Sequence, residues 1–231
     1  MKKALLKDSL KEIKNTYKRF ISILLMAFLG VGFFAGIKAS SPDMVDTIDT
    51  FYNKQNVYDI QVISTLGLTE EDIQALKQIQ GVEEIVGSYE MDGQLDIGNK
   101  EVIVKTMTIE EINKPILKEG RLPETKEECV VEENFLNKSQ MKIGDTIEVE
   151  IAKTTNKEGE EVDYLKQKQL KIVGTVQSPL YISGERGTSS LGTGKVNYYI
   201  YISEENIQEK ETYTNIYLKV NGANQYTTSS K

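Results

Sequence analysis

The chain has 231 residues, with 28 basic and 35 acidic side chains, a formal net charge of −7 and no histidine. Cys129 is its only cysteine, so an intrachain disulfide, a zinc cluster of histidine and cysteine, and a histidine-containing catalytic triad are all excluded. Seven of the cations but only two of the acids fall in residues 1–19, which leaves a strongly acidic remainder. An acidic body without clustered lysine or arginine argues against nucleic-acid binding.

A transmembrane helix is predicted at residues 20–37, which read FISILLMAFLGVGFFAGI and contain no charge. At roughly 1.5 Å per residue this segment is about 27 Å long, close to the hydrocarbon thickness of a bilayer. The alternative is a cleaved signal peptide, whose apolar region is usually shorter and ends in a small-x-small site. Ile37-Lys38-Ala39 fits such a site poorly, so a retained anchor is favoured.

The flanking charges predict the orientation of this helix. Residues 1–19 are basic and only Lys38 follows the span closely, so the positive-inside rule places the N-terminus in the cytoplasm and residues from about 40 outside it. An exported domain without disulfides favours a bacterial cell membrane as its location. Apolar side chains within residues 1–19 recur at helical spacing and predict an amphipathic helix on the inner membrane surface. The alternative is a solvated continuation of the transmembrane helix. The apolar positions are Leu6, Leu10, Ile13, Tyr17 and Phe20.

Residues 38–57 are predicted to form a stalk helix, because apolar residues recur at helical spacing from Asp43 to Asn56. Ser41 or Asp43 is the expected N-cap, with Pro42 tolerated in the first turn.

A strand at 58–64 and a short helix follow. Thr69 and Asp72 approximate a capping box for that helix, and Gly81 is expected to end it. The predicted buried face of the helix consists of Ile73, Leu76 and Ile79.

The remaining pattern predicts an α+β fold, with strands that pack against helices on one sheet face. The expected strands are 82–86, 94–108, 128–131, 146–151, 170–176, 198–202 and 213–220. Short helices are expected at 110–117 and 133–137, and exposed connections at 153–163 and 184–194.

No catalytic, cofactor or metal site is expected. The glycine-rich stretch 184–194 lacks the spacing of a phosphate-binding loop, and the acids within 153–163 lack a calcium-loop pattern. If any segment contacts a partner, the stretch around Glu185 and Arg186 is the candidate, because it is a long loop with both charges. The alternative is a plain connection.

The chain resembles the start of FtsX-like permeases of ABC transporters, whose extracytoplasmic part is called a MacB-like periplasmic core domain. The resemblance covers most of the chain and begins with the basic start and the span up to Ile37. It continues through short motifs that are weak singly but keep the family's order: Tyr58-Asp59-Ile60, Gly67-Leu68-Thr69, Gly81-Val82-Glu83, Gly120-Arg121-Leu122-Pro123, Ile143-Gly144-Asp145, Ile172-Val173-Gly174 and Ser178-Pro179-Leu180-Tyr181.

This resemblance implies a permease in the cell membrane that works with a separate cytoplasmic ABC ATPase, and with a second permease half or a second copy of itself. It implies no catalytic residues. The implied substrates are of the peptide, lipoprotein or antibiotic class. Family members carry further spans after the extracytoplasmic domain, so a chain ending at Lys231 is interpreted as an N-terminal fragment with an incomplete core domain.

The predicted organisation is a cytoplasmic helix (1–19), a transmembrane helix (20–37), a stalk (38–57), a core domain (58–222) and a tail (223–231). The rival interpretation is a single-span surface module that binds or senses a ligand. A membrane-anchored enzyme ranks third, because the sequence offers no nucleophile or metal motif.

Overall fold

The computed structural model describes residues 7, 11–98, 100–155, 160–182, 184–208, 210 and 212–223. The chain forms two compact units that divide between Thr50 and Phe51. Most of the tail predicted at 223–231, together with Leu6 and Leu10 of the predicted amphipathic face, lies outside the described residues.

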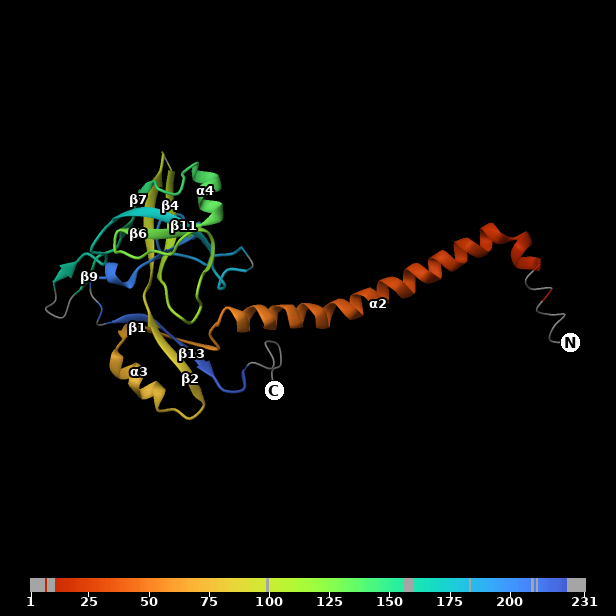
Figure 1. Ribbon diagram of the computed structural model, residues 1–231, viewed down its shortest axis with the longest axis horizontal. Coiled ribbons are helices and arrows are strands. Elements are labelled where there is room, and N and C mark those ends of the chain that lie inside the picture. The colour runs from red at the N-terminus through yellow and green to blue at the C-terminus, as the bar shows by residue number, and fades with distance from the viewer. Residues whose placement is uncertain are drawn as a thin grey trace. The chain divides into compact units, whose positions relative to one another are not determined.

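The first unit is built on helix α2 (Tyr17–Lys54), whose 38 residues include the predicted span and most of the predicted stalk (Figure 1). It is long and apolar enough to cross a membrane, with a mean hydropathy of 2.4 over its most apolar window. Residues 11–15 are also helical and are followed by a turn at Thr16.

The expectation of an N-cap at Ser41 or Asp43 was wrong, because α2 runs through Pro42 without a break. Pro42 cannot donate a backbone hydrogen bond, so the carbonyl of Lys38 lacks its usual donor within the helix, but the loss of one such bond does not end α2. The hydroxyls of Ser40 and Thr47 bond other carbonyls nearby, those of Ile37 at 2.9 Å and Asp43 at 2.7 Å. The anchor and the stalk are therefore one helix.

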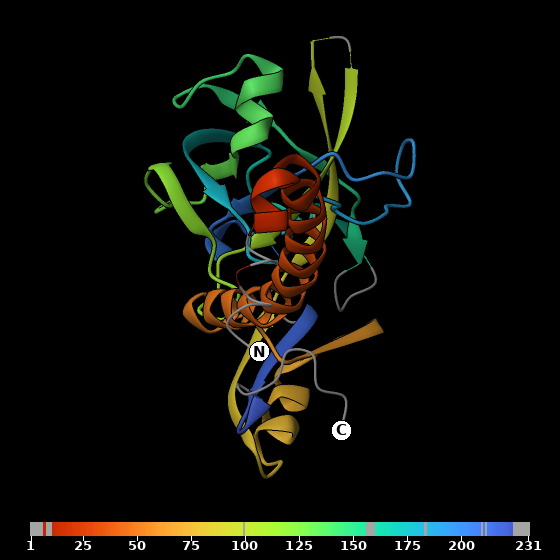
Figure 2. The same cartoon turned by 90° about the vertical axis from the view of Figure 1, so that its right-hand side faces the viewer.

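The second unit, called the folded domain below, contains two main sheets (Figures 1 and 2). The smaller sheet has the order β1-β13-β2 and is antiparallel throughout. Its strands are β1 (Ile60–Leu68), β2 (Val82–Ser88) and β13 (Tyr213–Val220). Helix α3 (Glu70–Lys77) packs on this sheet through Ile73 and Leu76.

The start of α3 is as predicted, because the Asp72 carboxylate accepts hydrogen bonds from the backbone N–H and the hydroxyl of Thr69 at 2.8 and 3.0 Å. The expectation that Gly81 ends the helix was wrong, because α3 ends at Lys77 with Gln78 as its C-cap. The φ of +102° at Gly81 instead suits the turn into β2. Ile79 was wrongly placed on the buried face, because α3 ends at Lys77 and the Ile79 side chain is 55% exposed.

The larger sheet has eight strands in the order β5-β11-β6-β12-β4-β3-β8, with β7 also paired to β11. Sixteen buried side chains, among them Phe135 of α4, fill one core of this domain. The described elements are β3 (Glu90–Ile97), β4 (Lys100–Thr108), β5 (Ile116–Gly120), β6 (Glu128–Glu132), α4 (Glu133–Ser139), β7 (Thr146–Glu148), β8 (Glu150–Ile151), β11 (Gln169–Gln177), β12 (Tyr198–Ile202) and the 3₁₀ turn η1 (Glu204–Asn206), with a separate hairpin of β9 (Thr154–Thr155) and β10 (Glu161–Val162).

Three predicted helices or strands differ from the structure. The single strand expected at 94–108 is a hairpin of β3 and β4, because the chain turns at Gly98 with a φ of +62°. The helix expected at 110–117 is wrong, because Asn113 adopts a left-handed φ of +63° and β5 begins at Ile116. The strand expected at 146–151 is two strands, since β7 pairs with β11 and β8 pairs with β3. Between them Val149 is fully buried and its N–H donates to the carbonyl of Lys168 at 2.9 Å. The chain thus changes its pairing strand at Val149, and the alternation of apolar and polar residues does not predict this change.

A close approach of β5 and β11 explains two of the family-like motifs. A Cβ on Gly120 would lie 2.2 Å from the carbonyl oxygen of Val173, and one on Gly174 would lie 2.6 Å from that of Glu119. Gly120 also has a φ of +78°. Only glycine fits this crossing, so both glycines serve backbone packing.

Candidate functional site

The first candidate site is the point where α2 enters the folded domain. Asn56 follows the helix with a left-handed φ of +49°, a conformation that asparagine tolerates at helix ends. Its side-chain amide donates to Glu84 Oε2 at 2.8 Å and to the carbonyl of Glu111 at 3.3 Å. Its own carbonyl accepts from the N–H of Asn113 at 3.0 Å. The end of the helix is therefore tied to β2 and to the loop 109–115.

Asn113 extends this network toward β1. Its side chain is buried, and Oδ1 accepts a hydrogen bond from the backbone N–H of Tyr58 at 3.0 Å. One backbone hydrogen bond, from the N–H of Asn113 to the carbonyl of Asn56, thus connects two segments 57 residues apart in sequence, and both residues adopt left-handed conformations.

A buried lysine completes the site. The Lys219 ammonium on β13 is held by the carbonyl of Val57 at 2.8 Å and by Asp59 Oδ1 at 3.3 Å. The second oxygen of Asp59 accepts from the N–H of Val220 at 2.8 Å. A buried charge with these partners strongly resists displacement, since removing one partner leaves the other uncompensated. We call Asn56, Val57, Asp59, Asn113 and Lys219 the stalk joint.

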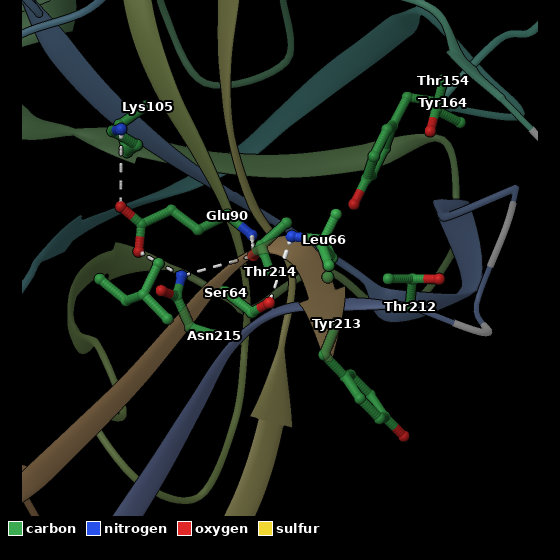
Figure 3. Close-up of a pocket in the computed structure, with 12 residues that line it drawn as sticks. Ser64, Leu66, Glu90, Lys105, Thr154, Tyr164, Thr212, Tyr213, Thr214 and Asn215 are labelled. Atoms are coloured by element: carbon green, nitrogen blue, oxygen red, sulfur yellow. Dashed lines mark hydrogen bonds and ion pairs between the residues drawn. The ribbon is translucent and has the colours of Figure 1, made fainter. Parts of the chain in front are cut away.

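The second candidate site is a groove of about 620 Å³ in the folded domain, between the smaller sheet and the segment around β9 and β10. Ser64, Thr214 and Asn215 lie along one side of it, and Thr154 and Tyr164 lie across the hollow (Figure 3). Most of the groove's lining is polar. Ile63 and Leu66 of β1 are exceptions, with side chains that are 67% and 94% exposed.

The carboxylate of Glu90 lies on the floor of this groove and contacts three polar side chains (Figure 3). Its Oε2 accepts from Asn215 Nδ2 at 3.2 Å and from the Tyr217 hydroxyl at 3.1 Å, while Oε1 lies 3.6 Å from Lys105 Nζ. Burial, and secondly the Glu90 charge, raise the pKa of Tyr217, so that phenol remains a neutral donor. Lys105 also pairs with Asp92 at 2.6 Å. Glu90 therefore connects β3 of the larger sheet to β13 of the smaller one.

Glu185 and Arg186 make different contacts in the structure. Glu185 is exposed. The Arg186 guanidinium forms a two-contact ion pair with Glu132, one contact being Nε to Oε2 at 2.6 Å, and it lies 6.0 Å from the centre of the Tyr199 ring. Arg186 thus fastens the 184–194 stretch to the larger sheet. Partner contact through this loop stays a prediction, and Glu185 is the exposed charge that such a contact would use.

No group of three or more histidine, cysteine, aspartate or glutamate side chains that could hold a metal ion occurs among the described residues. The only thiol, Cys129, is fully buried, and burial raises its pKa. These residues offer neither a metal centre nor a reactive thiolate.

Sequence reasoning missed Asn113, Lys219 and Glu90 as site residues. A lysine in the otherwise apolar stretch YLKV of β13 was the available signal, because a charged residue facing a core needs a partner. Nothing local marked Asn113 or Glu90, whose partners lie on distant segments.

A long apolar helix that could cross a membrane, followed by a mixed α/β domain, is typical of a membrane-anchored protein. The family model described as MacB-like periplasmic core domain matches residues 20–230, and the chain belongs to this family. The family contributes extracytoplasmic domains to ABC transporter permeases, so the resemblance seen in the sequence is confirmed. No curated protein matches the chain.

Three solved structures are similar to the chain. The extracellular domain of the noncanonic ABC-type transporter YknZ from Gram-positive bacteria is 14% identical, covers 70% of this chain and 78% of that one, and has a TM-score of 0.43. The periplasmic region of MacB from Actinobacillus actinomycetemcomitans has 14% identity, coverages of 69% and 66%, and a TM-score of 0.38. A domain of a permease protein from Porphyromonas gingivalis has 13% identity, coverages of 73% and 70%, and a TM-score of 0.35. Family membership rests on the family model.

Replacing Lys219 tests the energetic role of the stalk joint. We expect Lys219→Met to lower the free energy of unfolding by about 2–4 kcal/mol, because Asp59 loses its buried counter-charge. Urea unfolding of the full chain in detergent, followed by circular dichroism, measures this. Lys118→Met, on an exposed position of β5, should change stability by less than about 0.5 kcal/mol. Equal effects of the two variants would contradict the assignment.

Proposed function

We propose that this chain acts within a permease subunit of an ABC transporter and couples a separate cytoplasmic ATPase to the extracytoplasmic domain, for export or for transmission of mechanical work. The partners are the cell membrane, that ATPase, and a second permease half or a second copy of this chain. The substrate belongs to the peptide, lipoprotein or antibiotic class that the family resemblance implies.

The observation that carries this proposal is the stalk joint. A flexible linker would need none of the contacts made by Asn56, Asn113 and Lys219, whereas a helix that passes displacement to a domain needs a stiff connection. The joint supplies one through buried hydrogen bonds and an ion pair that connect the end of α2 to β1, β13 and the loop 109–115. Such contacts are costly to break one at a time.

The proposed orientation places the basic N-terminus in the cytoplasm and residues from about 40 outside. We expect a thiol at Ser41→Cys to react with a membrane-impermeant maleimide in intact cells, and one at Lys11→Cys to react only after permeabilisation. Both positions are exposed on the chain, and Cys129 is fully buried and will not interfere. Labelling of Lys11→Cys alone in intact cells would reverse the orientation.

The coupling is tested by inserting Gly-Ser-Gly-Ser after Val57 in the permease, reconstituted with its ATPase in lipid nanodiscs. We expect the unaltered permease to show an ATP-dependent change in amide hydrogen exchange of β1, β13 and β2, and the insertion to abolish it, because a flexible segment cannot pass on displacement.

The matched control is the same insertion after Gly98, at the turn of the β3–β4 hairpin, where a Cβ would meet no neighbour. The control should retain the ATP-dependent change. If the unaltered permease shows no change, the coupling proposal fails. If the Val57 insertion responds to ATP like the unaltered permease, the joint does not transmit motion.

The groove beside Glu90 favours a second candidate, a single-span surface module that binds or senses a ligand. In that case the domain would capture its ligand without any ATPase, and ATP would leave its hydrogen exchange unchanged. The same reconstitution therefore discriminates between the two functions.

A further inference from the structure

Strand β1 lies at one edge of the smaller sheet, whose order is β1-β13-β2. No strand of the described part of the chain pairs with its outer side. Along an edge strand, alternate backbone N–H and C=O groups point away from the sheet without a strand partner. Val62 and Leu68 pack in the same core as Ile73 of α3, so β1 is fixed in place while its outer edge stays open.

The second half of β1 borders the groove of about 620 Å³ described above. Regular pairing with β13 ends at Ile63, and the next pair, Leu68 with Tyr213, is shifted in register. Between these pairs the N–H of Leu66 donates to the Ser64 hydroxyl at 3.2 Å, and the strand curves beside the groove (Figure 3). β1 thus departs from its own sheet where the groove opens.

The side chains along the open edge are apolar and exposed. Ile60, Ile63 and Leu66 are 47%, 67% and 94% exposed. The nine residues of β1, IQVISTLGL, contain neither a charged residue nor a proline, although 27% of the whole chain is charged. An exposed edge of this composition favours pairing with another extended chain.

The other three strands that end the two main sheets differ from β1 in this respect. Each of them carries charge, namely Glu83 and Glu84 in β2, Lys118 and Glu119 in β5, and Glu150 in β8. Charged side chains protect an edge against pairing with other chains. Among these four edge strands, β1 alone lacks that protection.

The groove limits what can occupy the space beside β1. Thr154 and Tyr164 lie across the hollow from Ser64 and Leu66 (Figure 3). A groove with a wall on both sides suits one extended chain better than the sheet of a second copy. Its polar lining also offers hydrogen-bond partners to peptide groups that β1 does not bond.

We propose that the open edge of β1 binds an extended peptide by strand addition. The peptide bonds its backbone to β1 and packs apolar side chains on Ile63 and Leu66. In this mode of recognition, main-chain hydrogen bonds supply affinity and the side chains at alternate positions supply selectivity. The inference deepens the proposed transporter function, on which it rests for the role of the peptide as substrate, because it selects peptides among the implied substrate classes.

The test is peptide binding to the full chain in phosphatidylcholine nanodiscs without an ATPase, so that this inference and the proposed coupling can fail separately. The probe is a fluorescein-labelled peptide of alternating valine and threonine with a lysine at each end. We expect saturable binding by fluorescence anisotropy, with a Kd below about 1 mM, and slower amide hydrogen exchange of residues 60–68 in the complex. The same peptide with all its backbone nitrogens methylated keeps the side chains but cannot donate to β1. It should bind at least about tenfold more weakly.

A pair of double variants locates the site. Ile63→Glu with Leu66→Glu puts two charges on the open edge and should weaken binding by at least about tenfold. The loss would not come from repulsion, because the added carboxylates attract the lysines of the probe. The matched control is Ile79→Glu with Leu117→Glu, at positions 55% and 42% exposed and outside β1, and it should bind like the unaltered chain. Circular dichroism checks that both double variants are folded.

Three results would overturn the proposal: no binding of the probe by the unaltered chain, equal binding of the methylated peptide, or equal binding by the two double variants. A dimer of the unaltered chain that Ile63→Glu with Leu66→Glu dissociates would assign the edge to a second copy and overturn it as well. If the probe binds as expected while ATP leaves the hydrogen exchange of the complete permease unchanged, strand addition stands and the coupling fails.

Discussion

The pairing of β1 with β13 is the interaction on which the folded domain depends. Ile60 pairs with Leu218 and Val62 with Ile216, so the strand that follows the stalk is joined to the last described strand of the domain. Bringing β1 and β13 together, from opposite ends of the folded domain's sequence, costs conformational entropy. The burial of Ile216 and Leu218 along this pairing offsets that cost. Lys219 and Asp59 add an ion pair across the same two strands. This closure places β13 at the centre of the smaller sheet and holds Asp59, which directly precedes β1, against β13.

The closure also explains why polar residues gather where they do. A helix that enters a domain beside a sheet edge leaves backbone groups that need partners. Asn56, Asn113 and Asp59 supply those partners, and Lys219 neutralises the one carboxylate among them.

Local patterns predicted the elements that depend on local physics. The apolar run 20–37, the Thr69–Asp72 cap and the alternation at 198–202 and 213–220 all led to the observed helices and strands. Two of the failures coincide with long-range contacts: Asn113 is left-handed where it bonds to Asn56 and Tyr58, and the chain turns at Val149, where β7 and β8 have different partners. The joint and the Glu90 floor of the groove were missed for the same reason. Arg186 was correctly noted as a loop cation, but its partner Glu132 lies 54 residues away.

The most direct test of the central claim, that α2 enters the domain through a stiff joint, is the hydrogen-exchange rate of four amides at the joint. These are the N–H groups of Tyr58, Asp59, Asn113 and Val220, each of which donates within the network. A stiff joint predicts that they exchange as slowly as the central amides of β12, through opening of the whole domain. Exchange of all four at the rate of exposed loop amides would show that the helix is joined by a flexible linker and would contradict the account.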